Sequence, residues 1–161
     1  MKKGSVTILA GLAILLVLVF GVILKSQISS QIPNKTTLAK QSVGIKVGDA
    51  PLRVSLAKTD QEITKGLSET AHLDENEGML FVFQQKNQNR IFWMKDMLIS
   101  IDIIWIKDMK VVQIDKSVPA PAVGTPNASL KLYPSNQAID YALEVNAGFS
   151  DKNKITVGSL V

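Results

Sequence analysis

The run from Leu98 to Ile106, LISIDIIWI, constrains the fold of this chain more than any other segment. Isoleucine and tryptophan at this density favour a β-strand. Side chains alternate between the two faces of a strand, so Asp102 and Ile104 share one face while Ile103 and Trp105 share the other. Both faces are therefore apolar enough to need cover, and we expect this run to be a central strand of a buried sheet.

Asp102 is the exception within this run, because a carboxylate among isoleucines must be compensated by a cation or by backbone amides. Lys95 lies close upstream, and we name it as the expected partner of Asp102. A buried ion pair is one interpretation of this arrangement. A carboxylate that contacts a ligand or takes part in catalysis is the other.

The segments around this run predict a mainly β domain with many short strands. Val43 to Val47 and Leu52 to Leu56 alternate apolar and polar residues on either side of GDAP, which is typical of a hairpin. Further strands are expected at Met79–Phe83, at Ile91–Lys95 as a resumption of that strand, and at Val111–Ile114, Tyr141–Val145 and Ile155–Val161. We therefore predict an antiparallel β-sandwich or barrel-like domain with one short helix.

The expected helix lies near residues 60–68, where Thr59-Asp60-Gln61-Glu62 forms a capping box. Ile63 and Leu67 then fall on one face, and Gly66 lies close to the predicted end. A later segment, Ser117–Pro134, contains four prolines and is expected to be a long loop. Such a loop is a candidate lid over a binding groove, or a simple connection between sheets.

The N-terminus predicts a membrane anchor. Gly4 to Leu24 runs 21 positions without a charge and would reach about 31 Å as a helix, the hydrocarbon thickness of a bilayer. A cleaved signal peptide is the alternative, but its apolar region is usually shorter and ends at a small-x-small site. We expect an anchor at residues 1–24, a flexible linker at 25–41 and an extracytoplasmic domain at 42–161, with the N-terminus in the cytoplasm of a single-pass cell-membrane protein.

The distribution of charge argues against nucleic acid as a partner. Although the chain has a net charge of +4, residues 1–49 hold six lysines and one aspartate, so the rest carries 12 basic and 13 acidic residues. No basic run remains in the predicted domain. The chain also has no cysteine and a single histidine, His72, so we expect no metal site and no bound cofactor.

Five residues are candidates for ligand binding: Met79, Trp93, Lys95, Asp102 and Glu144. Trp93 and Met79 would line an apolar groove or pack in the core. Glu144 repeats the pattern of Asp102, a carboxylate within an apolar strand, and the two would form an acid/base pair if their faces converged.

Five blocks of sequence resemble a known family in order and spacing: GLSE, GMLFVF, FWMKDMLISIDIIWI, YPSNQAIDYALEVNAG and ITVGSLV. The chain is similar over residues 43–161 to the bacterial and archaeal domain of unknown function 192. The resemblance implies a β-sandwich-like domain, commonly exported or tethered to a membrane, and no established activity. Glu69 stands near the place of a usual arginine, Asp96 in place of asparagine and Ser159 in place of an acidic residue; the first two make that region more acidic and alter its preference for an anionic ligand.

The sequence thus favours a membrane-anchored extracytoplasmic binding module for a small molecule, a glycan or a short peptide. A cell-envelope hydrolase using Asp102 and Glu144 is one alternative. A non-enzymatic partner in an envelope complex is another. Binding is preferred over catalysis because no nucleophile or metal motif accompanies the two carboxylates.

Overall fold

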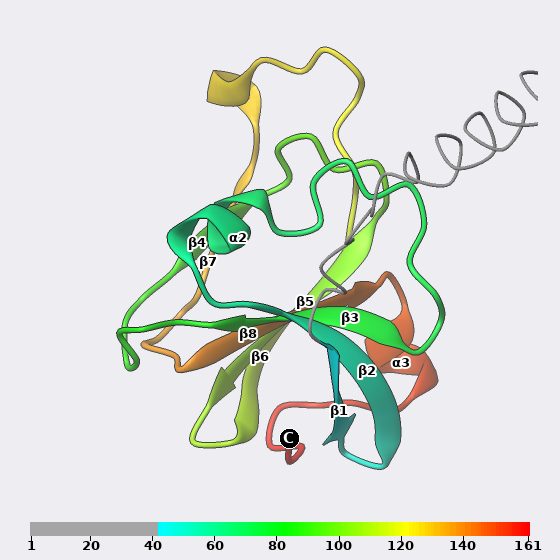
Figure 1. Ribbon diagram of the computed structural model, residues 1–161, viewed down its shortest axis with the longest axis vertical. Coiled ribbons are helices and arrows are strands. Elements are labelled where there is room, and N and C mark those ends of the chain that lie inside the picture. The colour runs from blue at the N-terminus through cyan, green and yellow to red at the C-terminus, as the bar shows by residue number, and fades with distance from the viewer. Residues whose placement is uncertain (1–41) are drawn as a thin grey trace, which may run out of the picture. The chain divides into compact units, whose positions relative to one another are not determined.

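A six-stranded sheet forms the centre of the computed structural model, which describes residues 42–161 (Figure 1). Its strands lie in the order β1 (Ser42–Val47), β2 (Ala50–Ala57), β3 (Glu77–Val82), β8 (Tyr141–Asn146), β5 (Ile101–Lys107) and β6 (Lys110–Val118). A two-stranded ribbon, β4 (Ile91–Trp93) and β7 (Leu132–Pro134), forms a second layer. The helices are short: α2 (Asp60–Lys65), α3 (Phe149–Lys152) and a 3-10 turn, η1 (Asn127–Ser129). The predicted mainly β fold is confirmed.

The predicted anchor at residues 1–24 and the predicted linker at 25–41 lie outside the described residues. Within residues 42–161, no helix has the length and apolarity that a bilayer crossing requires.

The sheet is mixed, so the prediction of an entirely antiparallel domain is wrong at one pair. β2 and β3 run parallel, with Val54 opposite Gly78 and Ala57 opposite Phe81. The reason lies in the connection: residues 58–76, which include α2, carry the chain back to the same end of the sheet before β3 begins. A crossover of this kind gives a parallel pair, whereas tight hairpins give the antiparallel pairs β1–β2 and β5–β6.

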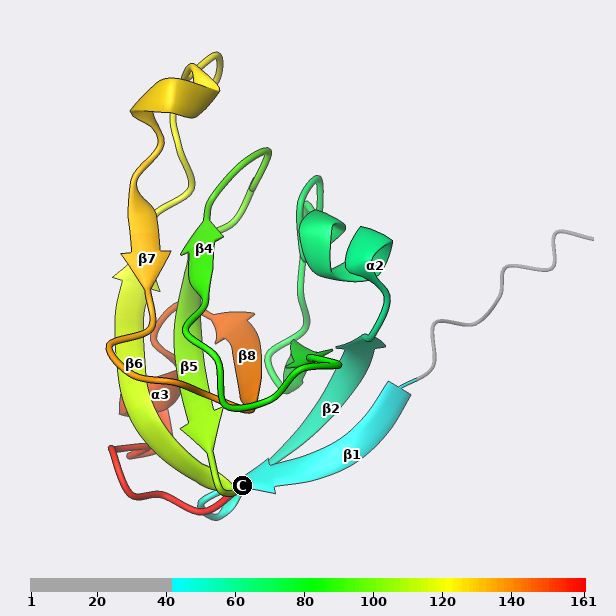
Figure 2. The ribbon, with the colours of Figure 1, turned by 90° about the vertical axis from the view of Figure 1, so that its left-hand side faces the viewer.

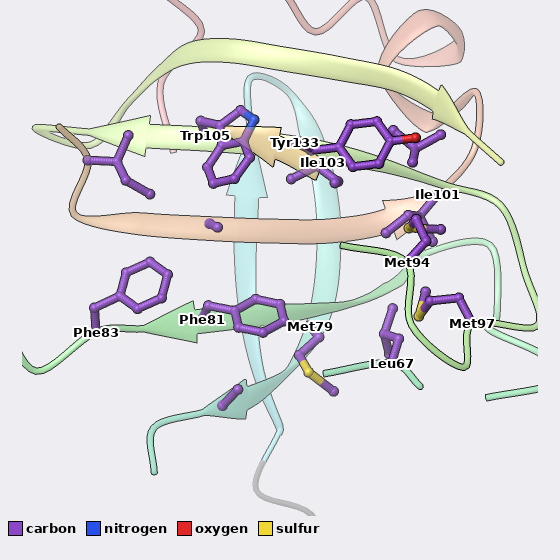
Figure 3. Packing of buried hydrophobic residues seen from close by; sticks show 14 residues of the cluster. Leu67, Met79, Phe81, Phe83, Met94, Met97, Ile101, Ile103, Trp105 and Tyr133 are labelled. Atoms are coloured by element: carbon purple, nitrogen blue, oxygen red, sulfur yellow. The ribbon is translucent and has the colours of Figure 1, made fainter. Parts of the chain in front are cut away.

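β5 is the central strand that the sequence predicts, and every residue from Ile101 to Ile106 is buried. It lies between β8 and β6, and a separate apolar core covers each of its faces. Ile103 and Trp105 belong to the core on the side of α2, which Figure 3 shows. Ile104 and Ile106 belong to the core on the opposite side, together with Phe149 of α3.

Two expected strands differ in the structure. Ile155–Val161 is not a strand; it is an irregular segment attached to β6 by an isolated bridge between Lys110 and Leu160. Gly158 has φ 95°, which interrupts an extended backbone. Ile91–Trp93 does not rejoin the sheet after β3; it pairs with β7, a strand inside the predicted proline-rich loop. Together these strands form the ribbon seen in front of β5 and β6 in Figure 2.

The predicted capping box at α2 is confirmed. The Glu62 amide donates to Thr59 Oγ1 at 3.2 Å, and the Thr59 amide donates to Glu62 Oε2 at 3.0 Å. The helix ends at Lys65, earlier than predicted, because Gly66 adopts φ 51° and ψ −133°. Only glycine reaches that conformation without strain, so Gly66 turns the chain sharply toward the sheet.

Gly78 permits the close approach of β3 and β8, and replacing it tests this contact. A Cβ atom at position 78 would lie 2.7 Å from the backbone oxygen of Glu144, whereas at Gly44 of β1 it would meet nothing within 4 Å. We expect Gly78→Ala to lower the free energy of unfolding by about 1–3 kcal/mol, because backbone must move. Gly44→Ala is the matched control and should be nearly neutral. Urea denaturation of both variants measures the difference, and equal midpoints would contradict this account.

Candidate functional site

A pocket of about 290 Å³ lies between the end of α2, the ribbon and the face of the sheet that α2 covers. We call it the Glu144 pocket. It is lined by Ile63, Thr64, Lys65, Gly66, Leu67, Ser68, Phe81, Ile91, Phe92, Trp93, Met97 and Glu144. Most of these side chains are apolar or aromatic, and Glu144 contributes a carboxylate to them. That composition is typical of a site for a small organic group.

Glu144 extends from β8 into this pocket and is only 5% exposed. Gly66 keeps space open in front of it: a Cβ atom at Gly66 would lie 3.6 Å from Glu144 Oε2 and 3.2 Å from the Phe81 ring. Since Gly66 also needs its positive φ, two requirements exclude a side chain there. The glycine that ends α2 therefore also shapes the pocket beside the carboxylate.

Aromatic rings form a continuous wall of the pocket. Phe92 packs edge-on against Phe81 at 4.8 Å and against Trp105 at 5.1 Å between ring centroids. Phe92 points inward from β4, whereas its neighbour Trp93 is 41% exposed at the rim. Figure 3 shows Leu67 and Met97 close to each other at one side of the same core. The wall is thus buried near the sheet and accessible at the ribbon.

Two hydrogen bonds hold the segment after α2 against the turn after β4. Ser68 Oγ donates to the backbone oxygen of Lys95 at 2.8 Å, and the Glu69 amide donates to that of Asp96 at 2.7 Å. Glu69 and Asp96 both have positive φ, 62° and 56°. The two left-handed residues let both segments turn at the same place, next to Ser68 and Met97 of the pocket lining.

The structure brings two of the five predicted site residues into this pocket, Trp93 and Glu144. Met79 lies directly across β3–β8 from Glu144 but is 1% exposed and packs in the core. Lys95 forms an ion pair with Asp96 at the surface. Asp102 lies elsewhere, as the next paragraphs describe.

The expected pairing of Asp102 with Glu144 is wrong. In the β5–β8 register Glu144 is opposite Ile103, and Asp102 is opposite Val145. Residues directly opposite each other share a face, so Glu144 faces the core beside α2 and Asp102 faces the core beside α3. The two carboxylates lie on opposite faces of the sheet and cannot act together on one bond, which removes the basis of the hydrolase hypothesis.

The expected partner of Asp102 is also wrong, because backbone amides rather than Lys95 compensate its charge. Asp102 Oδ1 accepts from the amides of Ser117 at 2.8 Å and Gly148 at 3.0 Å, and Oδ2 accepts from that of Ser150 at 2.9 Å. Asp102 is fully buried. Its role is structural: it connects β5 to the end of β6 and to α3.

A neighbouring hollow of about 380 Å³ adjoins the Glu144 pocket and shares Met97 with it. The proline-rich loop lines this hollow through residues 120–125, opposite Glu69 and Asp96. The loop was predicted to be either a lid or a simple connection; in the structure it lines this hollow, and none of its residues lines the Glu144 pocket. On the inner face of the ribbon, burial raises the pKa of the Tyr133 phenol, and the nearby Asp115 carboxylate raises this pKa further. Tyr133 thus stays neutral and packs as a core aromatic at physiological pH.

Within residues 42–161, no cluster of three histidine, cysteine or acidic side chains has the geometry to hold a metal ion. The Glu144 pocket offers a ligand a carboxylate on an aromatic wall, and Thr64, Lys65 and Ser68 also line it. Such a site accepts hydrogen bonds or pairs with a positive charge.

A profile of the family described as Uncharacterized ACR, DUF192, matches residues 43–161. The chain belongs to this family. A crystal structure of a protein of unknown function from Novosphingobium aromaticivorans is similar at a TM-score of 0.68 and 26% identity, covering 78% of this chain and 87% of that one. A second crystal structure, of a "putative transcription regulator" from Sinorhizobium meliloti, is similar at a TM-score of 0.60 and 25% identity, covering 68% and 80%. No curated protein gives a significant match.

Several lining residues of this DUF192 domain were not predicted from the sequence: Gly66, Leu67, Phe81, Phe92 and Met97. Four of the blocks that carry the family resemblance, GLSE, GMLFVF, FWMKD and YALEVNAG, each contribute to the pocket. These blocks were the signal in the sequence that could have identified the lining residues. Segments that are far apart in a chain but together carry a family's pattern often meet at one site.

Asp102→Asn tests the structural role of the buried carboxylate. The amide side chain keeps one acceptor oxygen and places an NH₂ group among amide donors, so we expect a loss of about 3 kcal/mol in the free energy of unfolding. The control is Asp74→Asn, since Asp74 is 66% exposed in its contact with His72. Denaturation followed by circular dichroism gives both values. If Asp102→Asn is as stable as the control, the structural role assigned to the three amide hydrogen bonds is contradicted.

Proposed function

We propose that this protein is a membrane-anchored extracytoplasmic binding module whose ligand site is the Glu144 pocket. One observation carries the proposal: a carboxylate that is only 5% exposed lies in an open, aromatic-walled pocket. A carboxylate withdrawn from water costs free energy, so a fold that keeps it beside an accessible cavity is typical of a binding site. The other buried carboxylate of the sheet, Asp102, lies on the opposite face, and binding is therefore favoured over catalysis.

The pocket indicates the chemistry of the ligand. Glu144 would accept hydrogen bonds from N–H or O–H groups, or pair with an ammonium group. Phe92 and Trp93 would pack against an apolar or flat surface of the same molecule. A volume of about 290 Å³ is at the lower end for a small-molecule site, so it suits one compact molecule or a single residue of a peptide or glycan.

The sequence supports the membrane location. The charge-free run from Gly4 to Leu24 is long enough to span a bilayer, and Lys2 and Lys3 precede it. The polar residues 25–41 would then separate the domain from the membrane. In this arrangement the domain is held outside the cytoplasm, where it meets ligands of the cell envelope.

Glu144→Gln and Trp93→Ala test the ligand site. We screen small amines, amino-acid amides and methyl glycosides against the purified protein by ligand-observed NMR and expect binding by at least one class. Each substitution should weaken that binding roughly tenfold or more, because one removes the charge and the other the stacking surface.

The matched control for this experiment is Glu75→Gln. Glu75 is exposed in an ion pair with Lys152 and does not line the Glu144 pocket. Its replacement should leave affinity unchanged, and melting temperatures of all three variants verify folding. Equal affinities of the Glu144→Gln variant and the wild type would contradict the site, as would the failure of every probe to bind.

The predicted topology has its own test. The full chain, with a tag after Val161, should stay in the membrane pellet after carbonate extraction. Protease added to intact spheroplasts should remove the tag, because the domain would lie outside the cytoplasm. A tag protected until the cells are lysed, or a chain released by carbonate, would contradict the anchored extracytoplasmic arrangement.

A further inference from the structure

The outer face of the β4–β7 ribbon is apolar and exposed. Side chains alternate along both strands, so Phe92 and Tyr133 point into the core while Ile91, Trp93 and Leu132 point away from it. The exposed fractions of these three are 63%, 41% and 55%. The ribbon thus has an aromatic inner face and an equally apolar outer face.

The outward side chains lie next to one another across the ribbon. Trp93 is opposite Leu132 and Ile91 is opposite Pro134, so the four form one continuous surface, which we call the ribbon patch. An antiparallel ribbon with one buried face usually carries polar residues on the other. A contiguous apolar surface of this kind indicates a binding partner.

We propose that the ribbon patch docks on the lipid bilayer to which the N-terminal segment anchors the chain. The inference rests on the proposed anchor, since that anchor keeps the domain beside a bilayer at all times. Residues 25–41 number 17, and a fully extended linker of that length reaches at most about 60 Å. This reach allows an exposed face of the domain to contact the membrane while the N-terminal anchor stays in the bilayer.

The composition of the patch matches a membrane interface. Tryptophan prefers the boundary between headgroups and acyl chains, and Ile91, Leu132 and Pro134 offer it apolar neighbours. The ribbon also lies at the periphery of the domain, at one side in Figure 1 and foremost in Figure 2.

Docking by this face would place the mouth of the Glu144 pocket at the bilayer surface. Ile91 and Trp93 belong both to the ribbon patch and to the lining of the pocket. The ligand would then approach from the headgroup layer rather than from bulk solution. An amphiphilic molecule with a hydrogen-bond donor or an ammonium group fits that approach and the carboxylate of Glu144.

Tryptophan fluorescence of the full chain in proteoliposomes tests the inference. The chain has two tryptophans, and Trp105 is fully buried with its Nε1 donating to Asp115, so Trp93 alone can report lipid contact. Vesicles of phosphatidylcholine and phosphatidylglycerol, with and without bromine on the acyl chains, supply the quencher. We expect brominated lipid to reduce the Trp93 emission about twofold, and the Trp93→Phe variant to show almost no quenching.

Two leucine variants localise the contact. Leu132→Ser alters the ribbon patch, and Leu160→Ser alters a leucine of similar exposure, 62% against 55%, on the C-terminal segment. We expect Leu132→Ser to lose most of the quenching and Leu160→Ser to retain it, with unchanged melting temperatures in both. Equal quenching of the two variants would overturn the assignment to the ribbon.

The outcomes also separate this inference from the proposed anchor. A chain that floats with the vesicles but shows no quenching of Trp93 overturns the docking surface and leaves the anchor intact. A chain that does not float contradicts the anchor, and the inference fails with it. If cross-linking joins two copies of the chain through the ribbon patch and Trp93 is not quenched, a second copy covers the patch. That result also overturns the inference.

Discussion

The domain depends on a buried charge that only the backbone compensates. Asp102 lies in the central strand, and its three hydrogen bonds come from amides at the end of β6 and around α3. One donor is available because β6 carries a bulge there: the register shifts between Ile101 and Ile103, and Ser117 adopts φ 48°. A carboxylate cannot leave such a site without stranding three amides, so it fixes the end of the sheet and the start of α3 together.

The two buried carboxylates on neighbouring strands show how the strand register decides which face of the sheet a side chain occupies. Asp102 and Glu144 are close in the β5–β8 pairing, yet a shift of one residue places them on opposite faces. On the side of α3, three amides donate to the carboxylate of Asp102, which is fully buried. On the side of α2, Gly66 and the ribbon leave a pocket beside Glu144. A carboxylate therefore stabilises the sheet on one face and lines a pocket on the other.

Local signals in the sequence predicted local structure well. The capping box of α2, the buried run of β5 and the β1–β2 hairpin all rest on neighbours in the chain, where periodicity is informative. The parallel pairing of β2 with β3 and the pairing of β4 with β7 depend on which strands meet. The periodicity of apolar residues along one strand does not encode its partner. Trp93 and Glu144 were found as candidates from their own residue types. Gly66 and Phe92 were missed, and Asp102 was assigned to the wrong partner, because both depend on which strands meet.

The ribbon connects the interior of the domain with its surface. Its inner residue Phe92 closes the aromatic wall of the pocket, and its outer neighbour Trp93 lies both at the rim of that pocket and in the ribbon patch. A three-residue strand paired only with β7 has few hydrogen bonds of its own, so its position rests on the packing of Phe92 and Tyr133 beneath it. Any partner that presses on the outer face must therefore act on the same short element that shapes the pocket. The alternation of side chains along β4 therefore lets one short strand contribute both to the pocket wall and to the outer face of the ribbon.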